Sequence, residues 1–408
     1  MSNSHKLKII NDPIYGFIPI HNELIFQVIE HPYVQRLRQI SQMGLSYLVY
    51  PGAHHTRFHH ALGAMFLMQR AVSVLRQKRV EISGAEEEAL YLAILLHDIG
   101  HGPFSHGLEG VIVTGVSHES LSLAIMDRLN VEFNGALDLA IEIFTGKHPK
   151  KFLKQLVSGQ LDMDRLDFLR RDSFYTGVAE GSISAQRLIA MLHVVDDCLV
   201  VEEKGIHSVE NFLVARRLMY WQVYLHKASL CAEHILIKIV KRARELTTKK
   251  VALGIQGPLN YFLSNDQEQE LTSEDLDNFL RLDDVDILAA LKIWMDHEDF
   301  VLSHLSRTII KRRLFKIKIK EEPFSEEKLE EKRQKIVQKH NLSKEEASYF
   351  VFTGSISNLA YNRSKENIQL LRKDGGLIDV AQASDQLHIK ALSEKVVKYF
   401  QCYPKTLD

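Results

Sequence analysis

Eight of the 20 histidines in this 408-residue chain fall between His54 and His118, where even scatter would place about three. Histidine suits such a concentration when chemistry uses its near-neutral pKa or its affinity for metal ions. Within this segment, LYLAILLHDIGHGPFSH runs from an apolar stretch into the adjacent polar residues His97 and Asp98. Burying such a pair costs several kcal/mol unless the pair is bound to something. The segment therefore predicts a metal site.

Further ligands for this site are expected on both sides of the pair. Upstream, PGAHHTRFHHALG contains His60; downstream, QLDMDRLDFLRRD contains four aspartates, Asp162, Asp164, Asp167 and Asp172. His60, the His97–Asp98 pair and one of these aspartates would place two nitrogens and two oxygens around one ion. Positions for water or substrate would stay open, as hydrolytic metal sites require. Such a set suits manganese, iron, zinc, nickel and, less naturally, magnesium.

More histidines follow the pair closely enough to share its cavity. His97 and His101 are four residues apart, so on a helix they would lie on one face. The glycines and the proline of GHGPF then end the helix and allow small ligands to approach the backbone. His106 follows in the loop, and His118 begins the next helix.

The elements that must position these residues are mainly helical. From about Leu24 to Lys250, apolar residues recur at three- and four-residue spacing, which predicts a long α-helical domain. Short strands are expected at residues 8–10, 198–203 and 315–319. The charge-rich stretch 321–347 predicts a solvated surface helix. After it, SYFVFTG and NIQLL predict strands, and the terminal KALSEKVVKYF predicts a helix.

These patterns predict a mainly α fold with small β hairpins and a C-terminal α+β segment. At about 100 to 200 residues per domain, the length allows two or three domains. We expect residues 1–240 to form the core, residues 241–320 a helical extension of it, and residues 321–408 the C-terminal α+β segment.

Composition excludes several classes of protein. Lys plus Arg (51) nearly balances Asp plus Glu (52), so bulk charge attracts no polyanion and nucleic-acid binding is not expected. Three widely spaced cysteines predict neither a disulfide framework nor a thiolate metal site. No signal-peptide core and no run of 18 apolar residues occurs. We therefore expect a soluble, cytoplasmic protein that does not bind membranes.

The order H…HD…D, with HDIGHGPFSH, resembles the HD-domain phosphohydrolases, and within them the deoxynucleoside triphosphate (dNTP) triphosphohydrolases. The similarity covers roughly residues 7–230, through KIINDPIYG, VQRLRQISQMG, YPGAHHTRFHHALG, SHES, LDMDRLDFLRRD and VYLHKA, and closely follows the metazoan SAM-and-HD-domain dNTPases. The last third, with RLDDVDILAALKIW and LAYN, is more similar to bacterial relatives. The resemblance implies an HD-domain helical core, one divalent metal ion, and hydrolysis of dNTP to deoxynucleoside and inorganic triphosphate.

Carried over position by position, the resemblance implies roles for the residues noted above. It makes four residues the metal ligands, with Asp162 the rival for the last place: His60, His97, Asp98 and Asp164. It makes three histidines catalytic: His101, His106 and His118. Glu109 stands where the metazoan enzymes have the aspartate that orients the last of these histidines, so we expect it to play that part with a longer side chain.

The resemblance also implies a nucleotide site. Arg57, Arg165 and Arg216 would contact the triphosphate. Gln42 and Asp172 would hold the sugar 3′-hydroxyl, and Tyr224 would pack against the deoxyribose and crowd out a 2′-hydroxyl. Leu225 replaces a polar residue near the base, so the resemblance implies no base preference.

Regulation and assembly are implied in the same way. Four residues fall where the metazoan relatives bind an activating guanine nucleotide between subunits: Lys8, Glu30, Gln35 and Arg38. Decoration of an amphipathic helix explains these polar residues almost as well. The family is oligomeric, so we expect a homodimer or a homotetramer.

Purely structural roles for some of these residues, and other functions for the protein, stay open. His54, His55 and His59 are expected at the surface or behind the metal ligands, and Arg170 and Arg171 are expected to pair with neighbouring aspartates on a helix surface. The reaction could be that of another HD phosphohydrolase, acting on nucleoside monophosphates, cyclic dinucleotides or guanosine polyphosphates. The basic run KRRLFKIKIK, residues 311–320, would suit a nucleic-acid or nucleotide-binding regulatory protein, although an exposed strand explains it better.

Overall fold

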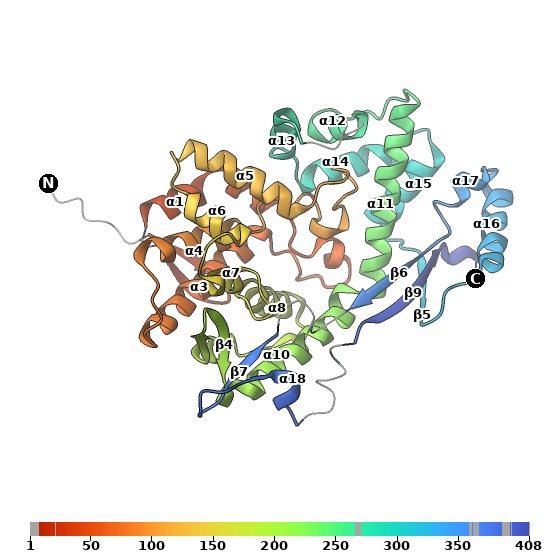
Figure 1. Ribbon diagram of the computed structural model, residues 1–408. Coiled ribbons are helices and arrows are strands. Elements are labelled where there is room, and N and C mark those ends of the chain that lie inside the picture. Colours follow the sequence, from red (N-terminus) through yellow and green to blue (C-terminus); the bar gives the residue numbers. More distant parts are fainter. Residues whose placement is uncertain are drawn as a thin grey trace.

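The computed structural model describes residues 8–20, 22–265, 271–358, 361, 367–385, 392 and 394–407. Within this part of the chain the fold is mainly α-helical, as predicted, with three small sheets (Figure 1). Buried apolar residues from Ile18 to Tyr403 form one connected core.

The N-terminal half is a helical bundle. Its central helix α3 (Arg57–Gln77) packs against α4 (Gly84–Leu96) and α8 (Met163–Thr176). Side-chain caps begin these helices: Ser83 and Glu86 form a capping box on α4, and Asp162 caps α8. The other helices of this half are α1 (Glu23–Glu30), α2 (Pro32–Gln35), α5 (His118–Glu132), α6 (Asp138–Thr145), α7 (Lys151–Val157), α9 (Ala185–Ala190) and α10 (Ile206–Met219).

The C-terminal half is arranged around the long helix α11 (Lys227–Thr248), which contacts α12, α15 and β5 (Figure 1). Its helices are α12 (Pro258–Ser264), α13 (Ser273–Phe279), α14 (Asp284–Trp294), α15 (Phe300–Ile310), α16 (Glu326–His340) and α17 (Lys344–Ala347). The short helix α18 (Val380–Ala383) lies apart from these and contacts α10 (Figure 1). The expected surface helix is α16, which buries only Leu329 and Ile336.

Short 3₁₀ turns and one π-helical turn join these helices. The 3₁₀ turns are η1 (Arg36–Gln39), η2 (Gly44–Leu48), η3 (Ser105–Gly107), η4 (Ala179–Gly181), η5 (Glu203–Gly205) and η7 (Lys405–Leu407). The π-helical turn, η6 (Tyr220–Tyr224), continues α10 directly. Such turns are rare and often occur at functional sites.

The three sheets are small and mostly antiparallel. The first is the hairpin of β1 (Lys8–Asp12) and β2 (Gly16–Ile20). The second has the order β3-β4-β7-β8, with β4 and β7 parallel: β3 (Leu192–Val195), β4 (Cys198–Glu202), β7 (Gln369–Leu371) and β8 (Leu377–Asp379). The third has the order β5-β9-β6: β5 (Lys316–Lys320), β9 (Val396–Tyr403) and β6 (Phe352–Asn358).

Most strands lie where the sequence predicts them, but one predicted helix is wrong. The end of KALSEKVVKYF forms β9, which pairs with β5 and β6; residues 390, 391 and 393 lie outside the described residues. The short apolar run VVKYF fits either period, and its β-branched and aromatic residues favour a strand between two neighbours. The strand predicted in SYFVFTG begins only at Phe352, because residues 348–351 close the turn after α17.

The C-terminal strands connect regions that are distant in sequence. β7 and β8 extend the sheet of β3 and β4, while β9, near the end of the chain, lies between β5 and β6 and pairs with both. The proposed boundaries at residues 240 and 320 therefore stay a prediction. The basic run 311–320 ends in β5, an edge strand, as the exposed-strand interpretation expects. No described helix is both long and apolar enough to cross a membrane.

Candidate metal centre and active site

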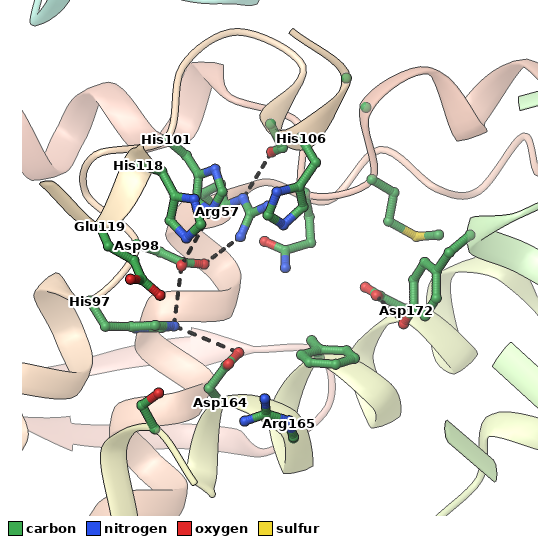
Figure 2. Close-up of a pocket in the computed structure, with 18 of the residues that line it drawn as sticks. Arg57, His97, Asp98, His101, His106, His118, Glu119, Asp164, Arg165 and Asp172 are labelled. Carbon is green, nitrogen blue, oxygen red and sulfur yellow. Dashed lines mark hydrogen bonds and ion pairs between the residues drawn. The ribbon is translucent and has the colours of Figure 1, made fainter. Parts of the chain in front are cut away.

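A cavity of about 790 Å³ opens in the N-terminal half of the fold, where Glu233 of α11 completes its lining. Its walls come from the segment before η2, the connection from α4 to α5, helices α7 and α8, the end of α10 with η6, and the start of α11. Figure 2 shows His97, Asp98, His101, His106, His118 and Asp164 gathered on one side of this cavity, with Asp172 apart from them.

The metal ligands expected from the sequence converge at one end of the cavity. Helix α3 supplies His60, α8 supplies Asp164, and the turn after α4 supplies His97 and Asp98. Asp164 Oδ1 lies 3.2 Å from His60 Nε2 and 3.6 Å from His97 Nε2, and Asp98 Oδ1 lies 3.4 Å from His97 Nε2. His60, His97 and Asp164 could together hold one ion.

Both imidazoles are prepared to bind a metal ion. His60 Nδ1 donates to Asp167 Oδ2 at 2.8 Å and His97 Nδ1 donates to the Ile94 carbonyl at 2.6 Å, which leaves each Nε2 with a free lone pair. Each Nε2 is buried and has no hydrogen-bond partner among the residues that the structure describes. Oriented imidazoles of this kind are typical of metal sites, so these residues fit a divalent ion.

The electrostatics of this cluster agree with a bound cation. Burial lowers the pKa of His60, but the nearby carboxylates of Asp164 and Asp167 outweigh it and raise the pKa to about 10. A metal ion would meet the same negative potential that favours the proton.

Asp162, the rival ligand, has other partners. It caps α8 by accepting from Arg165 N at 2.7 Å, accepts from Gly159 N at 2.8 Å, and contacts the Arg165 guanidinium. Burial raises its pKa to about 6. The geometry thus brings Asp164 into the cluster and leaves Asp162 outside it.

Three histidines form a second cluster beside the first. The ring centroid of His101 lies 4.1 Å from that of His118 and 4.7 Å from that of His106. Glu109 accepts from His118 Nδ1 at 2.5 Å and from His106 Nδ1 at 2.8 Å, so one carboxylate orients two rings. Burial and the Arg57 guanidinium hold the pKa of His101 well below its usual value, so this ring is neutral at pH 7.

The loop that carries these histidines has a strained backbone, which a hydrogen bond to a distant carboxylate stabilises. The expectation that His97 and His101 share a helical face is wrong, because α4 ends at Leu96 and a turn carries both residues. Phe104 and Ser105 have φ values of 54° and 53°, which β-carbon-bearing residues rarely adopt. The Asp284 carboxylate holds this conformation, because its Oδ1 accepts from Phe104 N at 2.7 Å.

Cationic side chains line the cavity next to the metal cluster. The Arg57 guanidinium contacts Asp98, and Arg165 contacts Asp162. In contrast, the buried Nε and Nη1 of Arg216 have no hydrogen-bond partner in the described part of the chain. Burial and the nearby charge of Arg165 lower the pKa of Arg216. Lys154 also lines this wall. This wall therefore attracts an anion.

A polar group suited to a sugar lies along the same cavity. Asp172, on α8, accepts from the Tyr224 hydroxyl at 2.7 Å, and His55 Nε2 lies 2.6 Å from its other oxygen. Gln42 lines the cavity nearby, and its buried Oε1 has no partner among the described residues. The π-helical turn η6 brings Tyr224 to this position.

The geometry agrees with what comparisons with known proteins find. Residues 57–171 match the HD domain, and residues 183–253 match the HD associated region. The crystal structure of a phosphohydrolase from Bacteroides thetaiotaomicron is 53% identical, covers 98% of this chain and 100% of its own, and superposes with a TM-score of 0.95. The chain belongs to the HD-domain phosphohydrolases. Membership in this family implies a metal-dependent hydrolase.

Two other relatives show how far the similarity of this HD phosphohydrolase extends. The Bacillus subtilis protein YwfO is 33% identical over 396 residues, which cover 92% of this chain and 88% of YwfO. Human deoxynucleoside triphosphate triphosphohydrolase SAMHD1 is 30% identical over 265 residues, which cover 54% of this chain and 42% of SAMHD1. This match thus spans less than half of the human enzyme.

The residues expected to bind an activator lie outside the cavity. Lys8 Nζ lies 3.1 Å from Glu23 Oε2, and Arg38 Nε donates to Gln35 Oε1 at 2.7 Å. Glu30, at the end of α1, is exposed. These contacts within one chain suit an amphipathic surface as well as a nucleotide site, and the activator site stays a prediction.

Several residues that support the HD site had no clear signal in the sequence. Arg171 is fully buried between Asp167 and Asp12, and not on a helix surface as expected. Asp167 in turn orients His60, and its spacing in DRLD was the only hint of this. Asp284 and Glu233 lie far in sequence from the histidine loop, so only the fold brings Asp284 to the backbone of that loop and Glu233 to the cavity.

Proposed function

We propose that this HD phosphohydrolase hydrolyses dNTPs to a deoxynucleoside and inorganic triphosphate. One observation carries the proposal: the metal-binding cluster, the Arg216 guanidinium with its unpartnered Nε and Nη1 atoms, and the Asp172–Tyr224 pair all line a single cavity. A metal cluster alone would serve many phosphohydrolases. The unsatisfied guanidinium nitrogens call for an anionic substrate, and the carboxylate–tyrosine pair calls for a substrate hydroxyl.

The cationic wall would bind the triphosphate. Arg165 and Arg216 present planar guanidinium groups, which suit phosphate oxygens, and Lys154 adds a third charge. A phosphate beside Arg216 would satisfy the buried Nε and Nη1 atoms, which otherwise lack partners. Arg57 would reach the phosphate that lies nearest the metal ligands.

The opposite wall would bind the sugar. The Asp172 carboxylate has remaining acceptor capacity for a 3′-hydroxyl, and Gln42 offers a free carbonyl oxygen beside it. The Tyr224 hydroxyl is fixed on Asp172, so its ring is held in place at the cavity wall. A ring packed against C2′ would leave no room for a 2′-hydroxyl, which predicts preference for deoxyribonucleotides.

The histidine cluster would handle protons. A divalent ion held by His60, His97, Asp98 and Asp164 would supply Lewis acidity toward a phosphoryl oxygen. Glu109 accepts from Nδ1 of His106 and His118, so their Nε2 atoms are free to exchange a proton.

In the overall reaction, water would add its oxygen to the α-phosphorus and the bond from that phosphorus to the 5′-oxygen would break. His118 would deliver a proton to the leaving 5′-oxygen, and the other product would be inorganic triphosphate. The name of the human relative, a dNTP triphosphohydrolase, supports this reaction for the present chain.

Regulation and assembly belong to the same proposal. A guanine nucleotide would bind near Lys8, Glu30, Gln35 and Arg38, between subunits of a homodimer or homotetramer. Adding GTP or dGTP to a dATP assay and measuring both the rate and the oligomer tests this part. If neither changes, the proposal of an activator site is wrong, and the proposal of hydrolase activity is unaffected.

Product analysis tests the reaction. Four dNTPs and four NTPs, singly and mixed, are incubated with the protein and manganese or magnesium, and the products are separated by anion exchange. We expect deoxynucleosides and triphosphate, with loss of both products in His97→Ala and Asp98→Ala variants. Orthophosphate, pyrophosphate or a linear dinucleotide would instead assign the protein to another HD phosphohydrolase reaction. No turnover with any nucleotide would refute the proposal.

A further inference from the structure

Glu233 lines the part of the cavity that the cationic wall and the sugar group leave free. It lies on the second turn of α11 and lines the cavity with Met43, Gly44 and Leu225. A β-carbon on Gly44 would lie 3.5 Å from Glu233 Oε1, and one on Gly107 would lie 3.5 Å from Glu233 Cγ. Glycine at both positions thus leaves space around the side chain of this glutamate.

Glu233 lacks the partners that the other inner carboxylates of this cavity have. Asp98, Asp164 and Asp172 each contact an arginine, a histidine or a tyrosine. No hydrogen bond or ion pair joins Glu233 to any residue that the structure describes. The side chain is half-buried and lines the cavity, so its carboxylate oxygens are open to a ligand. Burial alone raises the pKa of this carboxyl to about 7.

The order of groups along the cavity indicates what Glu233 faces. Leu225 directly follows Tyr224, and Met43 and Gly44 directly follow Gln42, so the Glu233 region adjoins the sugar group. A nucleotide with its phosphates at the cationic wall and its sugar at Asp172 would extend its base toward Glu233. This step rests on the function proposed above.

We propose that Glu233 reads the Watson–Crick edge of the base and selects guanine. The ionised carboxylate, the form that two donors from the base would stabilise, has two acceptor oxygens and no donor. Guanine alone among the four bases presents two adjacent donors, N1–H and the N2 amino group, and two parallel charge-assisted hydrogen bonds would result. Adenine and cytosine place one donor beside an acceptor, and thymine places its single N–H between two carbonyls. Met43 and Leu225 would contact the base faces.

The test compares dGTP, dITP and dATP as ligands and substrates of the full-length protein. dITP keeps N1–H and lacks only the N2 amino group, so it removes one of the two hydrogen bonds. A bidentate contact of this kind is worth about 5- to 150-fold in discrimination. We expect the wild type to prefer dGTP over dATP by about tenfold or more, and to prefer dGTP over dITP by a smaller factor.

Glu233→Gln should remove most of both preferences, because its amide directs a donor at one of the guanine donors. Glu119→Gln is the matched control: it neutralises another carboxylate that lines the cavity, next to His118, and should leave the dGTP to dATP ratio unchanged. Circular dichroism and the melting temperature verify that both variants fold.

Binding and turnover are measured separately, so this inference and the proposed function can fail independently. Dissociation constants come from titration of each triphosphate into metal-free protein, and kcat/KM comes from triphosphate release. Turnover of dNTPs with a base preference that Glu233→Gln leaves unchanged would overturn the inference and leave the function intact. Tighter binding of dGTP than dITP, lost in Glu233→Gln, would support the inference even without turnover. Equal affinity of the wild type for all three ligands would refute it.

Discussion

Asp284 connects two segments of the active site, and its replacement gives a quantitative test of how the cavity is built. One carboxylate oxygen accepts from Phe104 N at 2.7 Å, in the loop between His101 and His106, and the other accepts from Ser41 N at 2.9 Å, next to Gln42. Hydrogen bonds to a charged acceptor contribute about 1.5 to 3 kcal/mol each. Burial raises the pKa of Asp284 against these bonds, so the lower values apply. We expect Asp284→Ala to lower the free energy of unfolding by about 3 kcal/mol, and Asp284→Asn, which keeps one acceptor, by about half as much.

The effect on catalysis should exceed the effect on stability. Phe104 and Ser105 hold left-handed backbone conformations, and without the carboxylate the loop would relax and displace its histidines. A displacement of about 1 Å costs about 100-fold in rate. Asp283 is the matched control, because it also accepts a backbone N–H, from Val285 at 2.8 Å, but only to cap α14. Asp283→Ala should cost about 0.5 to 2 kcal/mol and leave kcat unchanged.

Three measurements test the predicted role of Asp284. Urea unfolding gives the stabilities, triphosphate release gives kcat, and hydrogen exchange of residues 98–110 reports opening of the loop whether or not the substrate is correct. We expect faster exchange in this segment only in the Asp284 variants. The reasoning is refuted if Asp283→Ala and Asp284→Ala change exchange and kcat equally.

Three further changes test other parts of the site. Asp167→Asn removes the carboxylate that orients His60, so the affinity for Mn²⁺, measured by competition with a chelator, should fall about 10- to 100-fold; unchanged affinity would contradict this role. Arg216→Met removes a buried guanidinium without hydrogen bonds at Nε and Nη1, so KM for the nucleotide should rise about tenfold or more while the melting temperature stays equal or rises; a lower melting temperature would show that Arg216 has a structural partner. Glu233 has its pKa raised from 4.5 to about 7, so the folded state retains a proton that the unfolded state loses between these pH values, and stability falls as pH rises through this window. Relative to Glu233→Gln, the free energy of unfolding of the wild type should therefore fall by up to about 3 kcal/mol between pH 5 and pH 8. The same difference in stability between the two proteins at both pH values would refute the shift in pKa.

The helical core and most strands could be predicted because their signals are local. Capping residues and three- and four-residue spacing identify α3, α4 and α8 without knowledge of their neighbours. β9 could not be predicted in this way. VVKYF is too short for its period to be decisive, and pairing with β5 and β6, more than 30 residues away in sequence, makes it a strand.

In the candidate site, too, some residues could be predicted from the sequence and others could not. His60, His97, Asp98, Asp164 and the three loop histidines stand out in the sequence, because their residue types are costly to bury and their order matches a known family. The family and the chemical class of the reaction follow from these residues alone. The sequence could not decide between Asp162 and Asp164, because both lie in one DxD. The start of α8 favours Asp164, because Asp162 is the cap of that helix.

The tertiary structure alone decided the remaining features of the cavity. Asp284 reaches the histidine loop from 180 residues away, and Glu233 lies beside Gly44 and Gly107 although no motif includes it. Whether a carboxylate is paired or unpaired depends on which distant segments pack around it, and no local pattern encodes that. The sequence therefore determined the chemical class of the site, and the packing of distant segments determined how the loop is held and which carboxylate in the cavity stays unpaired.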